Sequence, residues 1–301
     1  RKVWQQALTA QNNYGSPSVY GSVVYVSEDF YIYALKTSDG SKIWRAAIPS
    51  GDNGNIITSP LLAGGLLYVL TDSGNLYAFN SKDGSVAWNT PVSPHVGALA
   101  THSSSPVVDG RGVYIGSLDH TFYAFDAHSG SPLWKVTTRG KIISSPAVAN
   151  GVVYFGSGDN YVYALHGHDG SVKWKYLTGD DVQSSPAVAD GVVYVASNDG
   201  YLYTLNAETG KPYWRAPIGD YDATSNTVQN GGPVQCQPAI TGDAVCVVDT
   251  FNWVVRSYNR HDGSPRWAHK SADSYENADP IAANGLIVFG SGDQTIYAWG
   301  A

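Results

Sequence analysis

One motif recurs along the chain and restricts the possible folds more than any other feature. Its clearest copy begins at Ser184 and Pro186 and ends at Trp214, with two apolar and aromatic stretches between them, Gly191–Val195 and Tyr201–Tyr203. A period of about 40 residues indicates a repeat architecture with one supersecondary unit per repeat. The opening proline recurs as Pro17, Pro60, Pro106, Pro146, Pro186, Pro238 and Pro280, at steps of 43, 46, 40, 40, 52 and 42 residues.

Each copy of the motif reads as four short strands separated by turn signals. Three glycine-containing turns divide the four strands. The first is Ala-Gly, Asn-Gly or Asp-Gly, the second is Asp-Gly or a similar pair, and the third is Thr-Gly or Asp-Gly. The second and third strands are apolar or aromatic at both odd and even positions, whose side chains point to opposite faces of the sheet. This pattern indicates that both faces of the sheet are covered. Four-stranded sheets stacked face to face in a ring meet this requirement. The composition agrees, because 33 Gly, 21 Tyr and only 14% charged residues are typical of a turn-rich all-β protein.

The sequence therefore predicts an all-β fold, a single seven-bladed β-propeller over residues 1–301 with four-stranded antiparallel blades. The N-terminal Arg1–Trp4 matches the fourth-strand segment Ser41–Trp44, while the C-terminal Tyr297–Ala301 matches a third strand. We therefore expect the N-terminal strand to complete the last blade and close the ring, with the two termini side by side. The expected blades span residues 14–44, 57–88, 103–134, 143–174, 183–214, 235–267, and 277–301 plus 1–5.

The segment from the third strand to the closing tryptophan resembles the repeat of the PQQ-like β-propeller family, the quinoprotein alcohol dehydrogenase-like superfamily. The family pattern is roughly A-x-D-x-x-T-G-x-x-x-W, and one copy here is Ala124, Asp126, Ser129-Gly130 and Trp134. Six such copies and a split seventh cover nearly the whole chain. The resemblance implies that the tryptophans are structural and pack between neighbouring blades: Trp4, Trp44, Trp88, Trp134, Trp174, Trp214 and Trp267.

The resemblance implies two kinds of function. The family's enzymes hold PQQ and Ca²⁺ in a central funnel, with a catalytic aspartate and a disulfide between adjacent cysteines, whereas its BamB-like members are non-catalytic. Here Cys236 and Cys246 lie ten residues apart, and the seven units are compact. We therefore expect a non-catalytic scaffold or sensor that binds a protein partner or a small polar ligand and needs no cofactor. A PQQ- or metal-dependent oxidoreductase with its site in the funnel is the alternative.

The binding site is expected where the connections are longest. In a propeller, the loops from fourth to first strands and from second to third strands share one face, next to the channel mouth. The longest connections there are residues 91–104 and 217–237, and loops longer than a scaffold needs commonly carry function. The predicted ligand-binding residues at the channel mouth and in these loops are Tyr14, His95, His102, Arg139, Gln183, Tyr221, Gln235, Tyr275 and Asn277.

Two patterns could bind a metal ion. Asp220, Asp222 and Asn226 offer oxygen ligands at alternate positions, but the glycine and the closing glutamate of an EF-hand are missing, so an Asp-rich turn is favoured. His166 and His168 form a pair without a third ligand nearby, which favours solvated turn residues.

A recurring aspartate follows the second strand of several repeats and could form an acidic ring. Bonding of each carboxylate to its own turn backbone is the favoured interpretation. The aspartates are Asp29, Asp119, Asp159, Asp199 and Asp293.

Charge and hydropathy limit the partners. A net charge of −7 disfavours nucleic acid and anionic membrane surfaces, and no apolar run approaches the ~18 residues that a membrane helix needs. Scarce lysine with abundant Ser, Thr, Asn and Tyr suggests a periplasmic, cell-surface or secreted monomer. Counting across the Gly242-Asp243 turn puts Cys236 and Cys246 on one face, about two residues out of register, which favours two free thiols over a strained disulfide.

Overall fold

The computed structural model describes residues 3–8, 16–92, 104–222, 227–229, 236–249, 254–270, 280–290 and 295–300. These residues form strands and turns, and none of them belongs to a helix that is long and apolar enough to span a membrane. The chain divides into two compact units, residues 1–137 and residues 138–301, and each is described by itself.

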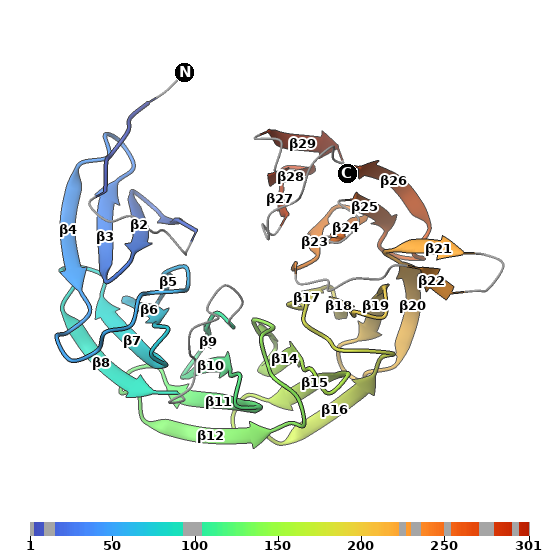
Figure 1. The fold of residues 1–301 in the computed structure, drawn as a ribbon, viewed down its shortest axis with the longest axis horizontal. Coiled ribbons are helices and arrows are strands. Elements are labelled where there is room, and N and C mark those ends of the chain that lie inside the picture. Colours follow the sequence, from blue (N-terminus) through green and yellow to red (C-terminus); the bar gives the residue numbers. More distant parts are fainter. Residues whose placement is uncertain are drawn as a thin grey trace. The chain divides into compact units, whose positions relative to one another are not determined.

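The first unit holds three antiparallel sheets of four consecutive strands each (Figure 1). Sheet 1 consists of β1 (Ser18–Tyr20), β2 (Val23–Glu28), β3 (Tyr31–Lys36) and β4 (Lys42–Ala47). Sheet 2 consists of β5 (Leu61–Ala63), β6 (Leu66–Leu70), β7 (Asn75–Asn80) and β8 (Val86–Pro91). Sheet 3 consists of β9 (Val107–Asp109), β10 (Gly112–Gly116), β11 (Thr121–Asp126) and β12 (Pro132–Thr137).

The second unit repeats this arrangement and adds a hairpin. Sheet 4 consists of β13 (Ala147–Ala149), β14 (Val152–Gly156), β15 (Tyr161–His166) and β16 (Val172–Leu177). Sheet 5 consists of β17 (Ala187–Ala189), β18 (Val192–Ala196), β19 (Tyr201–Asn206) and β20 (Pro212–Pro217), and the hairpin β21 (Asp220–Asp222) and β22 (Thr227–Gln229) follows it. Sheet 6 consists of β23 (Ala239–Thr241), β24 (Ala244–Asp249), β25 (Val254–Asn259) and β26 (Pro265–Lys270). Sheet 7 has three strands, β27 (Ile281–Ala283), β28 (Leu286–Gly290) and β29 (Ile296–Gly300).

The predicted all-β class and the four-stranded antiparallel repeat are confirmed in six sheets. The expected closure is not shown, because residues 3–8 form no strand and sheet 7 has no fourth strand among the described residues. The seven-blade count, the single domain and the side-by-side termini therefore stay predictions.

The second and third strands carry most of the core. Every residue of β10 and β14 is buried, which confirms that both faces of these strands are covered. Between sheets 4 and 5 the core includes Tyr154, Trp174, Val193 and Leu205. Burial of each such side chain is worth about 1.5–3 kcal/mol, so the contacts between sheets, rather than any one sheet, stabilise the fold.

The closing tryptophan of one sheet packs against the next sheet. A Cβ added to Gly210, which has φ of +70°, would lie 2.7 Å from the Trp174 ring, so only glycine fits there. Trp174 Nε1 and Tyr154 Oη both donate to the carbonyl of Ala207, each at 3.0 Å. Trp4, Trp44, Trp88 and Trp214 contact Gly40, Gly84, Gly130 and Gly263 in the same way.

Each fourth strand of sheets 1–6 contains a β-bulge, at which it has one residue more than the third strand. In sheet 5, Thr204 pairs with Trp214 and Leu205 pairs with Pro212, which leaves Tyr213 outside the register. Bulges redirect a side chain, and Tyr213 is 57% exposed. We call this position the bulge residue; in the other sheets it is Ile43, Ala87, Leu133, Lys173 and Arg266.

The two cysteines are buried and are not joined by a disulfide, in agreement with the sequence-based preference. Cys246 pairs with Ala239, three residues beyond Cys236, so the predicted offset of about two residues was too small. The two-residue turn sets this register, because Thr241 pairs directly with Ala244. Burial raises the pKa of the Cys246 thiol to about 11, which keeps it protonated and unreactive at neutral pH.

Candidate functional site

One end of the sheets carries the turns between second and third strands, and aspartates organise these turns. Asp159 Oδ1 accepts a hydrogen bond from the backbone of Tyr161 at 3.3 Å. Its Oδ2 accepts from Tyr163 Oη at 2.7 Å and from the backbone of Arg139 at 3.0 Å. Asp119 and Asp199 make the equivalent bonds to their own turns and tyrosines, so the turn-bonding interpretation is confirmed for Asp119, Asp159 and Asp199.

The tyrosines of these pairs remain protonated. Burial and the hydrogen bond to Asp119 raise the pKa of Tyr123 to about 12, and the same causes raise the pKa of Tyr163 and Tyr203 well above the usual range. A phenol that donates to a carboxylate in this way stabilises a turn, and its high pKa makes it a weak proton donor at neutral pH. Asp293 lies outside the described residues.

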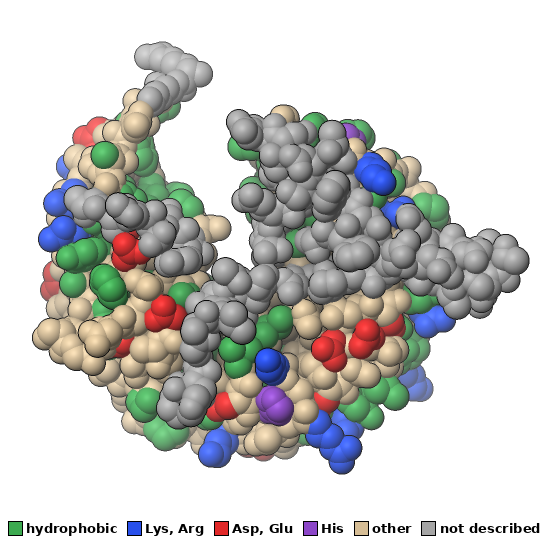
Figure 2. All heavy atoms as spheres, viewed as in Figure 1, with side chains coloured by type: hydrophobic (Ala, Val, Ile, Leu, Met, Phe, Trp, Pro, Cys, Tyr) green, Lys and Arg blue, Asp and Glu red, His purple; other side chains and the backbone are tan. Residues whose placement is uncertain are grey.

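Two predicted ligand-binding residues lie at this end of the sheets with described side chains. Arg139 is exposed, and Gln183 is partly buried beside Asp181. Burial raises the pKa of Asp181, and the nearby charges of Asp180 and Asp159 act in the same direction. Figure 2 views sheets 4 and 5 from this end and shows several acidic side chains over them.

The other predicted site residues cannot be assembled into a site from the described part of the chain. Asp220, Tyr221 and Asp222 form β21, but their side chains are outside the described set. The remaining predicted residues lie outside the described ranges: Tyr14, His95, His102, Asn226, Gln235, Tyr275 and Asn277.

A pocket of about 520 Å³ lies along the first strands of sheets 5, 6 and 7. Its walls are mainly Ala, Val, Ile and Pro, with Gln237, Thr241 and Arg260 as polar members. Gln237 Nε2 donates to the carbonyl of Pro186 at 3.1 Å, which links the first strands of neighbouring sheets. The pocket therefore has few side chains that could do chemistry.

The lining of this pocket does not fit PQQ with Ca²⁺. Calcium requires six to eight oxygen ligands, usually with several carboxylates, and no carboxylate lines the pocket. Within the described part of the chain, no three His, Cys, Asp or Glu side chains are grouped to hold a metal ion. The rings of His166 and His168 lie 5.8 Å apart, and His168 Nε2 pairs with Asp169 at 3.1 Å.

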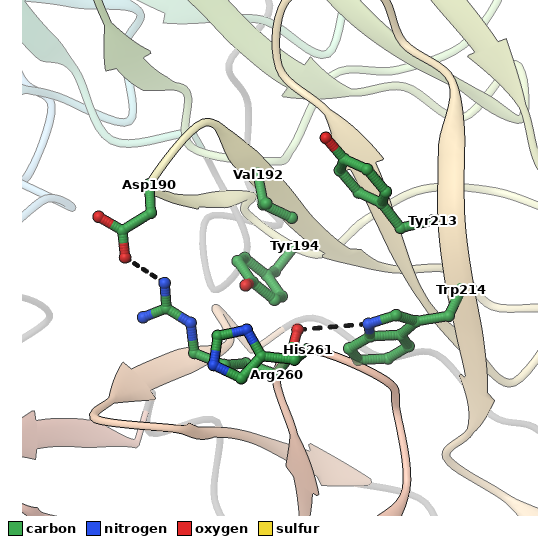
Figure 3. Close-up of a pocket in the computed structure, with 7 residues that line it drawn as sticks. All are labelled: Asp190, Val192, Tyr194, Tyr213, Trp214, Arg260 and His261. Atoms are coloured by element: carbon green, nitrogen blue, oxygen red, sulfur yellow. Dashed lines mark hydrogen bonds and ion pairs between the residues drawn. The ribbon is translucent and has the colours of Figure 1, made fainter.

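The opposite end of the strands holds a pocket of about 310 Å³ between sheets 5 and 6, which is lined by an acidic and a basic side chain (Figure 3). Tyr194 of β18 and Tyr213 and Trp214 of β20 form its aromatic wall. Asp190, from the β17–β18 turn, pairs with the guanidinium of Arg260, from the β25–β26 turn. The Arg260 side chain is only 13% exposed, whereas Asp190 is 76% exposed.

Arg260 keeps the backbone contact that the closing tryptophans make in the other sheets and adds a charged side chain beside it. Its carbonyl accepts from Trp214 Nε1 at 3.3 Å, and its Nη1 donates to the Gly242 carbonyl at 3.2 Å. Burial raises the pKa of Tyr194, while the adjacent Arg260 guanidinium acts in the lowering direction. Arg260 Nε is buried and has no hydrogen-bond partner in the described part of the chain.

A second pocket of about 400 Å³ lies next to it, between sheets 4 and 5. The two pockets share Asp190 and Tyr213. Lys173 Nζ pairs with Glu208 at 2.6 Å in the second pocket, and Asn206 Nδ2 donates to Tyr213 Oη at 2.6 Å. We call these two cavities the paired pockets.

Our sequence analysis did not predict the paired pockets, although one signal was present. The first residue after each third strand is small in five repeats, namely Thr37, Ser81, Ala127, Gly167 and Ala207. The sixth repeat has Arg260 there, a departure that marks this turn.

The sequence profile of the family described as outer membrane protein assembly factor BamB matches residues 1–117 and 96–301. BamB of Yersinia pestis is 27% identical over 127 residues, which cover 38% of this chain and 31% of that protein. BamB of Escherichia coli K12 is 31% identical over 83 residues, which cover 25% of this chain and 21% of that protein. The chain thus aligns with less than a third of the length of these relatives.

Solved structures share the fold at low sequence identity. BamB from Moraxella catarrhalis superposes with a TM-score of 0.78 at 19% identity, covering 99% of this chain and 86% of that one. Quinohemoprotein alcohol dehydrogenase from Comamonas testosteroni superposes with a TM-score of 0.77 at 14% identity, and the match covers 97% of this chain and 66% of that one. A BamB protein and an alcohol dehydrogenase therefore share this architecture, and only the site can distinguish functions on it.

Proposed function

Because this chain belongs to the family of the outer membrane protein assembly factor BamB, we propose that it is a non-catalytic β-propeller scaffold that binds partner proteins. The match of the family profile to both compact units is the observation that carries this proposal. The chemistry of the described residues supports it. The turn aspartates Asp119, Asp159 and Asp199 are occupied by turn backbones and tyrosines, and the pocket along the first strands has no carboxylate.

The proposed process is the assembly of outer membrane proteins, as the name of the relatives states, in the periplasm or at the cell surface. The proposed binding surface is the end of sheets 4 and 5 that carries Arg139, Gln183, Asp159 and Asp199. Asp159, Asp180 and Asp181 make this end of sheets 4 and 5 locally acidic. Such a surface attracts a basic partner and increases the rate of encounter.

The test is binding of the purified chain to the other purified outer membrane assembly subunits of the same organism. We expect a complex whose association rate falls as the salt concentration rises. Asp180→Lys should slow association roughly tenfold at low salt, because charges at the rim of an interface act mainly on the encounter rate. The matched control is Lys211→Glu, a charge reversal at the opposite end of sheet 5, which should leave the rate unchanged. Absence of any complex, or equal effects of both variants, would contradict the proposal.

A further inference from the structure

The paired pockets have an exposed aromatic ring between them. Tyr213 belongs to both lining sets and is 57% exposed because the bulge of β20 turns it away from the core. Its hydroxyl is held by Asn206 Nδ2 at 2.6 Å, which fixes the orientation of the ring. A tyrosine ring presents a flat apolar face and a polar rim, which suits a ligand that has both kinds of surface.

The charges of the paired pockets are balanced. Together the two pockets contain two carboxylates and two cationic side chains, and Asp190 lines both pockets. Asp190 is paired with Arg260, and Glu208 is paired with Lys173, so a free anion or cation would find no unpaired charge there. A neutral ligand with many hydroxyl groups fits better, because a hydroxyl donates to a carboxylate and accepts from a cationic side chain.

One polar group in the first pocket lacks a partner. Arg260 Nε is buried and makes no hydrogen bond within the described part of the chain, while Nη1 and Nη2 of the same side chain are bonded. A buried donor without an acceptor is unfavourable, and because Arg260 Nε is shielded from solvent, a ligand hydroxyl would bond it only after a shift of the Arg260 side chain. The repeat does not require this arginine, since five other repeats carry a small residue at its position.

From these observations we propose that the paired pockets bind a neutral oligosaccharide, with one sugar unit in each pocket and the ring of Tyr213 against an apolar sugar face. Volumes of about 310 and 400 Å³ are at the lower end for ligand pockets and suit single sugar units. The site lies at the opposite end of the strands from the proposed partner surface, so a failure of one proposal would not contradict the other.

Saturation-transfer NMR and calorimetry test the proposal with glucose, maltose, cellobiose and N,N′-diacetylchitobiose as probes. We expect saturable binding of at least one disaccharide. Tyr213→Ala should weaken this binding roughly tenfold, as loss of an aromatic contact does. Leu133→Ala is the matched control, because Leu133 is the bulge residue of sheet 3 and is 41% exposed, and its removal should leave binding unchanged.

A second pair of variants tests whether both pockets take part. Asp190→Asn keeps a residue that tolerates the positive φ of 49° at this turn, and it should weaken both monosaccharide and disaccharide binding. Glu208→Gln should weaken only disaccharide binding, since Glu208 lines the second pocket alone. If none of the four sugars binds saturably, or if Tyr213→Ala binds like the unaltered chain, the proposal is wrong.

Discussion

At the scale of single residues, one backbone carbonyl joins two sheets. Ala207 accepts from both Trp174 and Tyr154, which come from different strands of the preceding sheet. The sequence predicted a structural tryptophan here, because Trp174 closes a repeat. It could not predict the shared acceptor, since every residue has a carbonyl and only the packing of two sheets selects this one.

Replacement of Trp174 should separate the contribution of packing from that of the hydrogen bond. Trp174 is 8% exposed, so Trp174→Ala should lower the free energy of unfolding by about 3–5 kcal/mol. Trp174→Phe keeps an aromatic ring and loses the bond to Ala207, and should be clearly less harmful. Urea denaturation monitored by circular dichroism measures both. Equal losses would show that the ring contributes little.

Asp181 should weaken the folded state at neutral pH. The pKa of Asp181 is higher in the folded state than in the unfolded state, where it is near 3.9. The protonated carboxyl therefore favours folding at low pH, and this contribution to the free energy of unfolding is lost as pH rises through the folded-state pKa. Asp181→Asn should therefore stabilise the protein at pH 7, by less than about 1 kcal/mol after solvent screening. The gain should disappear at pH 3, and urea midpoints at the two pH values measure it. An equal gain at both would exclude a charge effect.

At the scale of strands and turns, the repeat predicted six sheets well, because apolar strands and glycine turns are local signals. The paired pockets were not predictable in this way. Their shared residue, Tyr213, faces outward only because β20 has one residue more than its partner in the β19–β20 ladder. A bulge is a property of strand register, which the residue pattern of a single strand does not contain.

Alanine substitutions at two glycines of sheet 5 should distinguish the cost of backbone strain from the cost of a steric clash. Gly191 and Gly210 both have positive φ, of 75° and 70°. A Cβ on Gly191 meets nothing within 4 Å, so Gly191→Ala should cost only the left-handed conformation, about 1–2 kcal/mol. Gly210→Ala also forces a methyl group against Trp174, which adds about 1–3 kcal/mol. Thermal and urea denaturation should rank the variants in this order, and the reverse order would contradict the docking of Trp174 on Gly210.

At the scale of the whole molecule, the sequence predicts a contact that depends on how the two ends of the chain meet. Trp4 lies against Gly40 of sheet 1, as Trp44, Trp88, Trp174 and Trp214 lie against their own glycines. Pairing of residues 1–5 with β29 joins the two units and so stays a prediction. Most predicted ligand-binding residues belong to long loops, whose conformations are not set by the repeat pattern that identified the strands.

Engineered cysteines test the closure. If Trp4 occupies the position of Trp44, then Gln6 corresponds to Ala46, which pairs with Ile32 in sheet 1, and Gln6 should lie opposite Ile296. Gln6→Cys with Ile296→Cys should form a disulfide on mild oxidation, because directly opposed residues have Cβ atoms about 4.5–5.5 Å apart. Non-reducing electrophoresis detects it, with Gln5→Cys and Ile296→Cys as the control pair on opposite faces. Efficient cross-linking of the control pair alone would contradict the proposed register.

PQQ with Ca²⁺ should not stabilise the chain. A ligand that binds only the folded state raises the unfolding temperature, and the pocket along the first strands offers no carboxylate for the metal ion. Differential scanning fluorimetry with and without both additives measures this. A saturable increase in unfolding temperature that EDTA removes would instead support the oxidoreductase alternative.

The bulge in each fourth strand also affects how such a chain can evolve. The bulge residue is outside the regular register of the ladder, and in sheets 1, 3 and 5 it is largely exposed, so its identity can change without disturbing the contacts that hold neighbouring sheets together. Drift at this position can give each repeat a different surface while the duplicated scaffold stays the same. A library randomised at Ile43, Leu133 and Tyr213 would thus be a direct route to new binding specificities on an unchanged framework.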